Sequence, residues 1–155
     1  MRKTYVFDQK TNDPQQWYWF SQALTEEEVS KVISLASFLP QERATTIGDS
    51  GDLKVATENR SSMVKWIPQN EEWGWLYEKL IGLAHEANDE TWNFDLVAAP
   101  EAIQYTEYYA SEDGHYDWHQ DIGVGELPSR RKVSITLQLS ADDEYVGGEL
   151  QLTGG

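Results

Sequence analysis

The residues with the clearest chemical potential lie in one short segment, GHYDWHQDIG at positions 114–123. In an extended strand, residues two positions apart point to the same side, so His119 and Asp121 can reach one ion. An imidazole and a carboxylate that leave coordination positions open suit Fe(II) in oxygen chemistry, where two His and one carboxylate occupy one face of an octahedron. The remaining positions can hold a bidentate 2-oxoacid and dioxygen. The pair therefore indicates a candidate iron site.

A His-x-Asp triplet alone is a weak signal, because it also occurs as a hydrogen-bonded surface pair. The same segment contains a second triplet, His115 with Asp117, whose side chains would share a face with the first pair on a regular strand. At most one of the two pairs is expected to bind metal, and the spacing leaves the choice open. The remaining histidine, His85, is expected on a helix surface or at the edge of the core.

The wider segment 103–152 resembles Fe(II)/2-oxoglutarate-dependent oxygenases of the prolyl-4-hydroxylase type. Their pattern is a Tyr, a Gly-containing turn, Tyr-x-x-His-x-Asp, an Arg-rich strand, an acidic loop and Gly-Gly-x-Leu. The matching residues are Tyr108, Gly114, Tyr116, His119, Asp121, Arg131, the loop 142–145, Gly147, Gly148 and Leu150. Because Tyr116 stands three positions before His119, the resemblance assigns the metal to His119 and Asp121. It leaves His115 and Asp117 as supporting or surface residues, with Asp117 able to orient a ligand.

The resemblance also implies a cofactor set: Fe(II), 2-oxoglutarate as co-substrate and ascorbate as a candidate reductant. The residues that it places in the 2-oxoglutarate pocket are Tyr108, Thr136, Gln138 and Leu150. Gln138 takes the position from which some relatives use a Tyr to hydrogen-bond the distal carboxylate, and Leu150 would form an apolar wall.

The implied activity is hydroxylation of an unactivated C–H bond, with a peptidyl proline as the leading substrate. Lysine, a free amino acid or a small metabolite remain open as substrates. Candidates for the substrate pocket are Tyr116, Trp118 and Arg131.

Two parts of the family pattern are missing from the sequence. Relatives carry a second His ligand and then an Arg or Lys that pairs with 2-oxoglutarate, both after the Gly-Gly turn. Here no His follows His119, and no Arg or Lys follows Lys132. We therefore expect the chain as given to bind iron weakly, with little or no turnover, and the natural chain to continue and supply both groups.

Composition narrows the classes of partner. The chain has 27 acidic and 12 basic residues, a formal net charge of −15, which disfavours nucleic acids and anionic membranes. Its 7 Trp, 8 Tyr and 4 Phe argue for a folded core. The absence of cysteine excludes disulfides, thiolate metal sites and cysteine nucleophiles.

The sequence shows no signal peptide and no apolar run of about 20 residues, so we expect a cytoplasmic protein. It leaves the oligomeric state open.

Helices are expected first along the chain. Thr25, followed by three Glu, predicts an N-cap for a helix that stops near Pro40. A second helix is expected over residues 71–87. Its predicted buried face comprises Trp73, Leu76, Tyr77, Leu80, Leu83 and Ala84.

Strands are expected mainly in the second half, over residues 92–97, 102–109, 132–139 and 149–152. The segment 132–139 has the clearest alternation of apolar and polar residues. Short strands are also expected within residues 1–20, where Tyr5 and Phe7 alternate with polar residues before a turn at 12–14. Residues 44–54 are expected to form a polar loop.

This order of elements predicts an α+β protein. The resemblance implies a double-stranded β-helix (jelly-roll) core in one domain, residues 1–155, with support from 1–95 and an incomplete jelly-roll part in 96–155. A rival interpretation is a non-catalytic β-sandwich whose aromatic side chains bind sugar or peptide. A cupin-like metalloprotein is less favoured, because those proteins use a His-x-His pair that this chain lacks.

Overall fold

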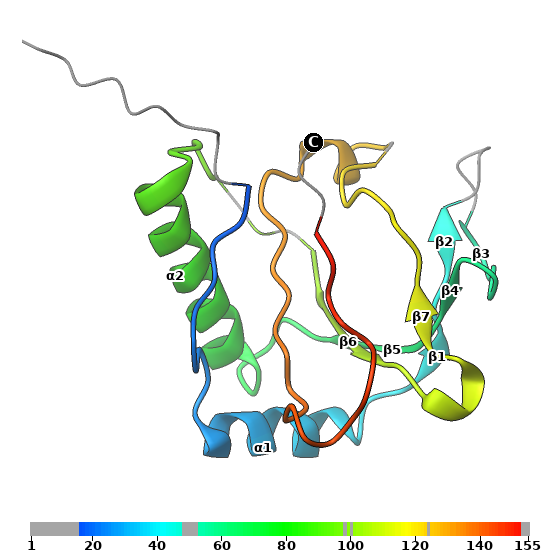
Figure 1. Ribbon diagram of the computed structural model, residues 1–155. Helices are drawn as coiled ribbons and strands as arrows, with labels where there is room; N and C mark the ends of the chain where they lie inside the picture. Colours follow the sequence, from blue (N-terminus) through cyan, green and yellow to red (C-terminus); the bar gives the residue numbers. More distant parts are fainter. Residues whose placement is uncertain (1–15, 48–52, 98, 100, 124, 153–155) are drawn as a thin grey trace, which may run out of the picture.

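The computed structural model describes residues 16–47, 53–97, 99, 101–123 and 125–152, which form an α+β fold (Figure 1). The helices are α1 (Glu26–Ala36) and α2 (Gly74–Thr91), with short 3₁₀ turns η1 (Ala110–Glu112) and η2 (Pro128–Arg130). The strands are β1 (Glu42–Arg43), β2 (Thr46–Ile47), β3 (Leu53–Lys54), β4 (Arg60–Ser61), β5 (Met63–Ile67), β6 (Ile103–Glu107) and β7 (His115–Tyr116). Strands β1, β5 and β6 form one antiparallel sheet, while β2 with β3 and β4 with β7 form two-stranded ribbons. No closed barrel is present in this part of the chain.

Helix α1 begins where the sequence predicts. The Thr25 hydroxyl accepts a hydrogen bond from the Glu28 amide at 3.2 Å, and the Thr25 amide donates to the Glu28 carboxylate at 2.7 Å. This reciprocal capping box satisfies two amides that the first helical turn leaves unpaired. Val32 and Ala36 are buried on the inner face, and the helix ends shortly before Pro40 as expected.

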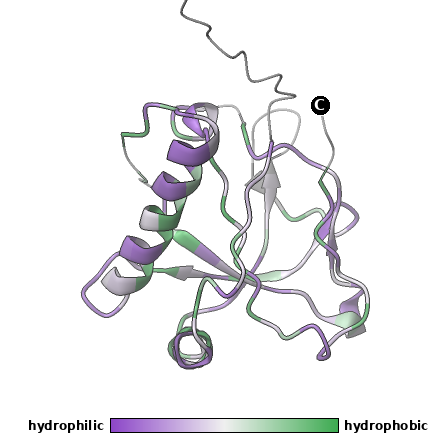
Figure 2. Cartoon of the chain, turned by 60° about the vertical axis from the view of Figure 1, so that its left-hand side comes forward, coloured by the Kyte–Doolittle hydropathy of each residue, from purple (hydrophilic) through white to green (hydrophobic). Residues whose placement is uncertain are grey.

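Helix α2 provides much of the core. Trp73, Leu76 and Leu80 are buried as predicted, and they belong to one cluster with residues of α1. In Figure 2, hydrophobic and hydrophilic residues alternate along α2, as expected of a helix with one buried side. The helix begins later than predicted, because the Asn70 side chain accepts from the Trp73 amide and holds residues 70–73 in a turn.

The three-stranded sheet is fastened to α2 by a tyrosine. Ile67 and Ile103 are partners at one end of the β5–β6 pairing. The Tyr77 hydroxyl donates to the Ile67 carbonyl at 2.6 Å and accepts from the Ile103 amide at 2.9 Å. Strand β6 confirms the strand predicted at 102–109.

The chain turns tightly between β6 and β7, and the turn requires a glycine. A Cβ atom added at Gly114 would lie 2.7 Å from the backbone nitrogen of Tyr109, closer than real Cβ atoms come. The preceding Asp113 has a left-handed φ of 50°. After this turn, β7 runs antiparallel to β4 and carries the chain toward His119.

Two segments predicted as strands, 132–139 and 149–152, form none among the described residues. They run through the centre of Figure 1, coloured orange and red. Leu137 and Leu139 pack against the core cluster, while Ile135 is 49% exposed. A strand needs a second backbone about 4.8 Å away, and no described segment pairs with either.

Residues 92–97 also form no strand. Helix α2 continues through Thr91, past its predicted end. Beyond it, the Asn88 side chain bonds both backbone groups of Phe94, accepting from its amide at 2.8 Å and donating to its carbonyl at 3.0 Å. These groups are therefore not available to a neighbouring strand.

The predicted polar loop 44–54 is partly wrong, because β2 and β3 pair within it. The strands expected around Tyr5, Phe7 and the turn at 12–14 lie outside the described residues, and residues 16–20 form no strand. Neither α1 nor α2 combines the length and apolar character needed to cross a membrane.

Candidate metal centre

The segment that carries the candidate metal ligands leaves β7 beside β4. Arg60 and Tyr116 are partners in the β4–β7 ribbon, as are Ser61 and His115. One residue further, the Asp117 amide donates to the Asn59 carbonyl at 2.9 Å. The backbone is thus held as far as Asp117, and His119 and Asp121 follow in an irregular loop rather than on the strand that the sequence predicts.

His119 is held in one tautomer. Its Nδ1 lies 2.7 Å from the Asp117 carbonyl oxygen. Because a carbonyl only accepts, Nδ1 carries the proton, and Nε2 of the neutral ring is an acceptor. It is therefore the backbone of Asp117, rather than its carboxylate, that orients this histidine.

The Nε2 atom of His119 lies 3.3 Å from Asp121 Oδ1. Two acceptors at this distance repel each other unless a cation lies with them, either a proton on Nε2 or a metal ion. Neighbouring ligands of an octahedral ion, each about 2.1 Å from it, are about 3 Å apart. The donor set and its spacing therefore fit a metal ion.

The pair provides two ligands and no more. Within the described residues, no group of three or more His, Asp or Glu side chains could hold an ion. Both side chains are partly open to solvent, with exposed fractions of 38% for His119 and 53% for Asp121. On its own, such a pair supports weak binding.

Stacked side chains support the His119 ring. The Tyr116 and His119 rings are nearly parallel, with centroids 3.6 Å apart. The Arg60 guanidinium lies 4.4 Å from the Tyr116 centroid. Arg60 is buried, and it donates to Ser62 Oγ at 2.9 Å and to Gln104 Oε1 at 2.6 Å. These contacts fix Tyr116 and, through it, the plane of the imidazole.

A cavity of about 490 Å³ opens beside the pair. Its volume lies in the range of about 300–1,000 Å³ that is usual for small-molecule sites. The residues that line it are Thr46, Asn59, Tyr116, Asp117, Trp118, His119, Gln120, Asp121, Ile122, Gly123 and Arg131. It brings together both predicted metal ligands and all three predicted substrate-pocket residues.

Arg131 is already engaged in this cavity wall. It donates to Glu101 through Nε at 2.7 Å and through Nη2, and Nη1 donates to the Asp121 carbonyl at 2.7 Å. The hydrogen bonds from Arg131 hold the pKa of the Glu101 carboxyl below its usual range. The same hydrogen bonds raise the pKa of the Arg131 guanidinium.

The four residues predicted for the 2-oxoglutarate pocket do not line this cavity. Thr136 and Leu150 are exposed, and Gln138 donates to the Tyr145 hydroxyl at 3.2 Å. Tyr108 is 48% exposed overall. Burial of its hydroxyl nevertheless raises the pKa of Tyr108, an effect that nearby Arg60 partly offsets.

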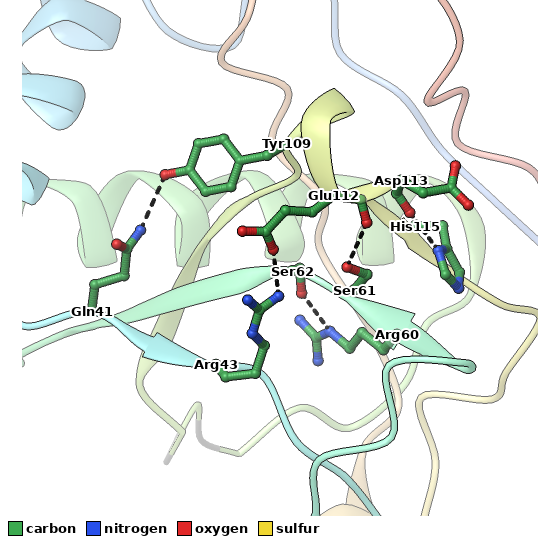
Figure 3. A network of polar contacts seen from close by, with 9 residues as sticks. All are labelled: Gln41, Arg43, Arg60, Ser61, Ser62, Tyr109, Glu112, Asp113 and His115. Carbon is green, nitrogen blue, oxygen red and sulfur yellow. Dashed lines mark hydrogen bonds and ion pairs between the residues drawn. The ribbon is translucent and has the colours of Figure 1, made fainter.

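The second histidine of the segment is placed differently. His115 Nδ1 lies 2.7 Å from the Asp113 carbonyl (Figure 3), and its Nε2 lies 3.3 Å from the Glu58 carbonyl. These carbonyl acceptors raise the pKa of His115. Because both ring nitrogens face acceptors, His115 has no nitrogen directed at a shared ion with Asp117.

Sequence reasoning missed several residues around the centre. Glu101 carries no motif, and only the structure brings it to Arg131. Arg60 lies in the segment NRSS at 59–62, in which the sequence predicts no site residue. Thr46, whose buried hydroxyl has no hydrogen-bond partner among the described residues, also lines the cavity.

No family model, curated protein or solved structure matched the chain.

Proposed function

We propose that the chain carries the metal-binding part of an Fe(II)- and 2-oxoglutarate-dependent oxygenase domain of the prolyl-4-hydroxylase-like kind. The observation that carries this proposal is that His119 Nε2 and Asp121 Oδ1 lie 3.3 Å apart in the wall of a cavity. The bond from His119 Nδ1 to the Asp117 carbonyl supports it, because metal-binding histidines commonly donate their other ring N–H in this way.

The finer fold belongs to the same proposal. Segments 132–139 and 149–152 have no strand partner among the described residues, and 132–139 keeps an alternating apolar pattern. In a double-stranded β-helix they would be strands, paired with backbone outside the described residues. A third ligand and a basic group for 2-oxoglutarate would also have to come from outside them.

When bound, iron and 2-oxoglutarate would supply the oxidising chemistry with dioxygen as the oxidant: one oxygen atom would become the hydroxyl on the substrate carbon and the other would enter succinate, with release of carbon dioxide. The chain's own residues would bind and orient. His119 and Asp121 would hold the ion, while Tyr116 would keep the imidazole in plane. Trp118, which is 64% exposed at the cavity, would offer an apolar surface to a substrate such as a peptidyl proline.

The test is a titration with Mn(II), a redox-stable substitute for Fe(II). His119→Ala and Asp121→Ala should each weaken Mn(II) binding by more than about tenfold, because mutation of a residue that only orients a metal ligand already lowers metal affinity by about that factor. His115→Ala is the matched control, since it removes a histidine from the same segment, and it should leave the affinity unchanged. Equal affinity of the wild-type chain and His119→Ala would contradict the proposal.

A second candidate function is a binding module for sugar or peptide. The exposed indoles favour it: Trp19 is 69% exposed and Trp118 is 64% exposed. Such surfaces stack on sugars and prolines. This module would show ligand-induced changes in tryptophan fluorescence without any metal, and no iron-dependent uptake of 2-oxoglutarate. Uptake that requires iron and is lost in Asp121→Ala would exclude it.

A further inference from the structure

One guanidinium connects three segments beside the candidate metal centre. Arg131 follows η2, Glu101 precedes β6, and Asp121 lies in the loop after β7. Arg131 grips the Glu101 carboxylate with two nitrogens and donates to the Asp121 carbonyl at 2.7 Å with a third. A two-nitrogen contact of this kind fixes the plane of the guanidinium as well as its position.

This bonding limits what Arg131 can offer a ligand. Three of its N–H groups are already used, and the Glu101 carboxylate balances its charge. An anion entering the cavity would find only two N–H groups left and would meet the negative charge of Glu101. Direct recognition of a substrate by Arg131, the role that the resemblance implies, is therefore disfavoured relative to support of the neighbouring backbone.

The supported backbone belongs to the candidate ligand itself. Asp121 is held through its carbonyl by Arg131, while its carboxylate faces His119 Nε2. Asp121 lies in no strand or helix, so its conformation depends on contacts of this kind. A ligand that is already oriented loses less conformational freedom on binding an ion.

We infer that Arg131 and Glu101 form a positioning pair, which holds the Asp121 backbone so that its carboxylate is presented to the same ion as His119. The inference rests on the proposed function, because it takes Asp121 as a metal ligand. Neither member of the pair contacts the ion. Instead, the pair raises the fraction of metal-free molecules in which Asp121 already has the metal-binding geometry.

Arg131→Gln separates positioning from charge. Removing a positive charge near the centre should, by Coulomb's law alone, tighten Mn(II) binding. Loss of positioning should instead weaken it, and we expect about tenfold weaker binding. Glu101→Gln keeps Arg131 but loosens it, and we expect Mn(II) binding weaker by about two- to fivefold, as for an exposed ion pair.

The matched control is Arg43→Gln. Arg43 pairs with Glu112 at 2.6 Å (Figure 3), and the two side chains are 35% and 42% exposed, close to the 37% of both Arg131 and Glu101. That pair does not line the cavity. Arg43→Gln should leave the Mn(II) affinity unchanged.

A second readout needs no metal. Amide hydrogen exchange of the peptide that covers residues 117–123 should be faster in Arg131→Gln and Glu101→Gln than in the wild-type chain, and unchanged in Arg43→Gln. If Arg131→Gln keeps the exchange rates and the Mn(II) affinity of the wild-type chain while His119→Ala loses affinity, the positioning inference alone is overturned. Equal Mn(II) affinity of His119→Ala and the wild-type chain would overturn the proposed function, and the inference with it.

Discussion

Replacing Tyr77 by Phe tests how α2 is fastened to the sheet. The change removes one oxygen atom that makes two hydrogen bonds, to the Ile67 carbonyl at 2.6 Å and from the Ile103 amide at 2.9 Å. Tyr77 is 9% exposed and Ile67 is 1% exposed, so water reaches these groups poorly. Each bond contributes about 0.5–1.5 kcal/mol net. We therefore expect Tyr77→Phe to lower the free energy of unfolding by about 2 kcal/mol.

The assay is equilibrium unfolding in urea, followed by tryptophan fluorescence. The midpoint should fall while the slope m stays constant, because the same surface is exposed on unfolding. Tyr109→Phe is the control, since its exposed hydroxyl accepts from Gln41 at a longer 3.3 Å (Figure 3). It should cost less than about 0.5 kcal/mol. An equally small loss in Tyr77→Phe would refute the reasoning.

Two further predictions concern the turn before the candidate metal centre. Gly114→Ala should destabilise the chain by about 1–3 kcal/mol, because its Cβ would meet the Tyr109 backbone. In the same urea experiment Gly82→Ala is the control: its Cβ meets nothing within 4 Å, so the change should stabilise α2 by about 0.5–1 kcal/mol. Unchanged stability of Gly114→Ala would show that the turn is not close-packed. His115 should titrate above its ordinary pKa of 6.5, because backbone carbonyls accept from its ring. The stability that the His115 side chain adds, relative to His115→Gln, should therefore be fully present below pKa 6.5 and should be lost as the pH rises through the higher pKa of the folded state. NMR titration of His115 and unfolding at several pH values check this. A folded-state pKa at or below the ordinary value would contradict this assignment.

Local signals predicted the local features of the fold. Thr25 and the glutamates after it placed the start of α1 correctly, because a capping box involves residues three positions apart. The burial of Trp73 and Leu76 likewise followed from helical periodicity. The strand at 132–139 was predicted from an equally clear pattern and did not form in the described part. Alternation says which side chains face inward, whereas a strand also requires a distant partner.

In the candidate site, too, the sequence predicted what neighbouring residues determine and missed what distant residues determine. The spacing of His119 and Asp121 predicted that the two side chains could reach one ion, and they lie 3.3 Å apart, in a loop held by the Asp117 carbonyl. Arg131 was expected near the substrate, and its partner Glu101 was not foreseen. The two residues are 30 positions apart, and no local pattern links them. Whether metal binds at this pair stays a prediction.

The contacts around the centre have a consequence for how the domain assembles. The loop that bears His119 is fastened to Asn59 at one end and, through Arg131, to Glu101 at the other. Each fastening closes a long stretch of chain, at an entropic cost that helix formation does not incur. The capped helix can form from its own neighbours, whereas the candidate metal centre exists only after three remote stretches have met. We therefore expect the geometry of this centre to form late in folding, once both fastenings are made.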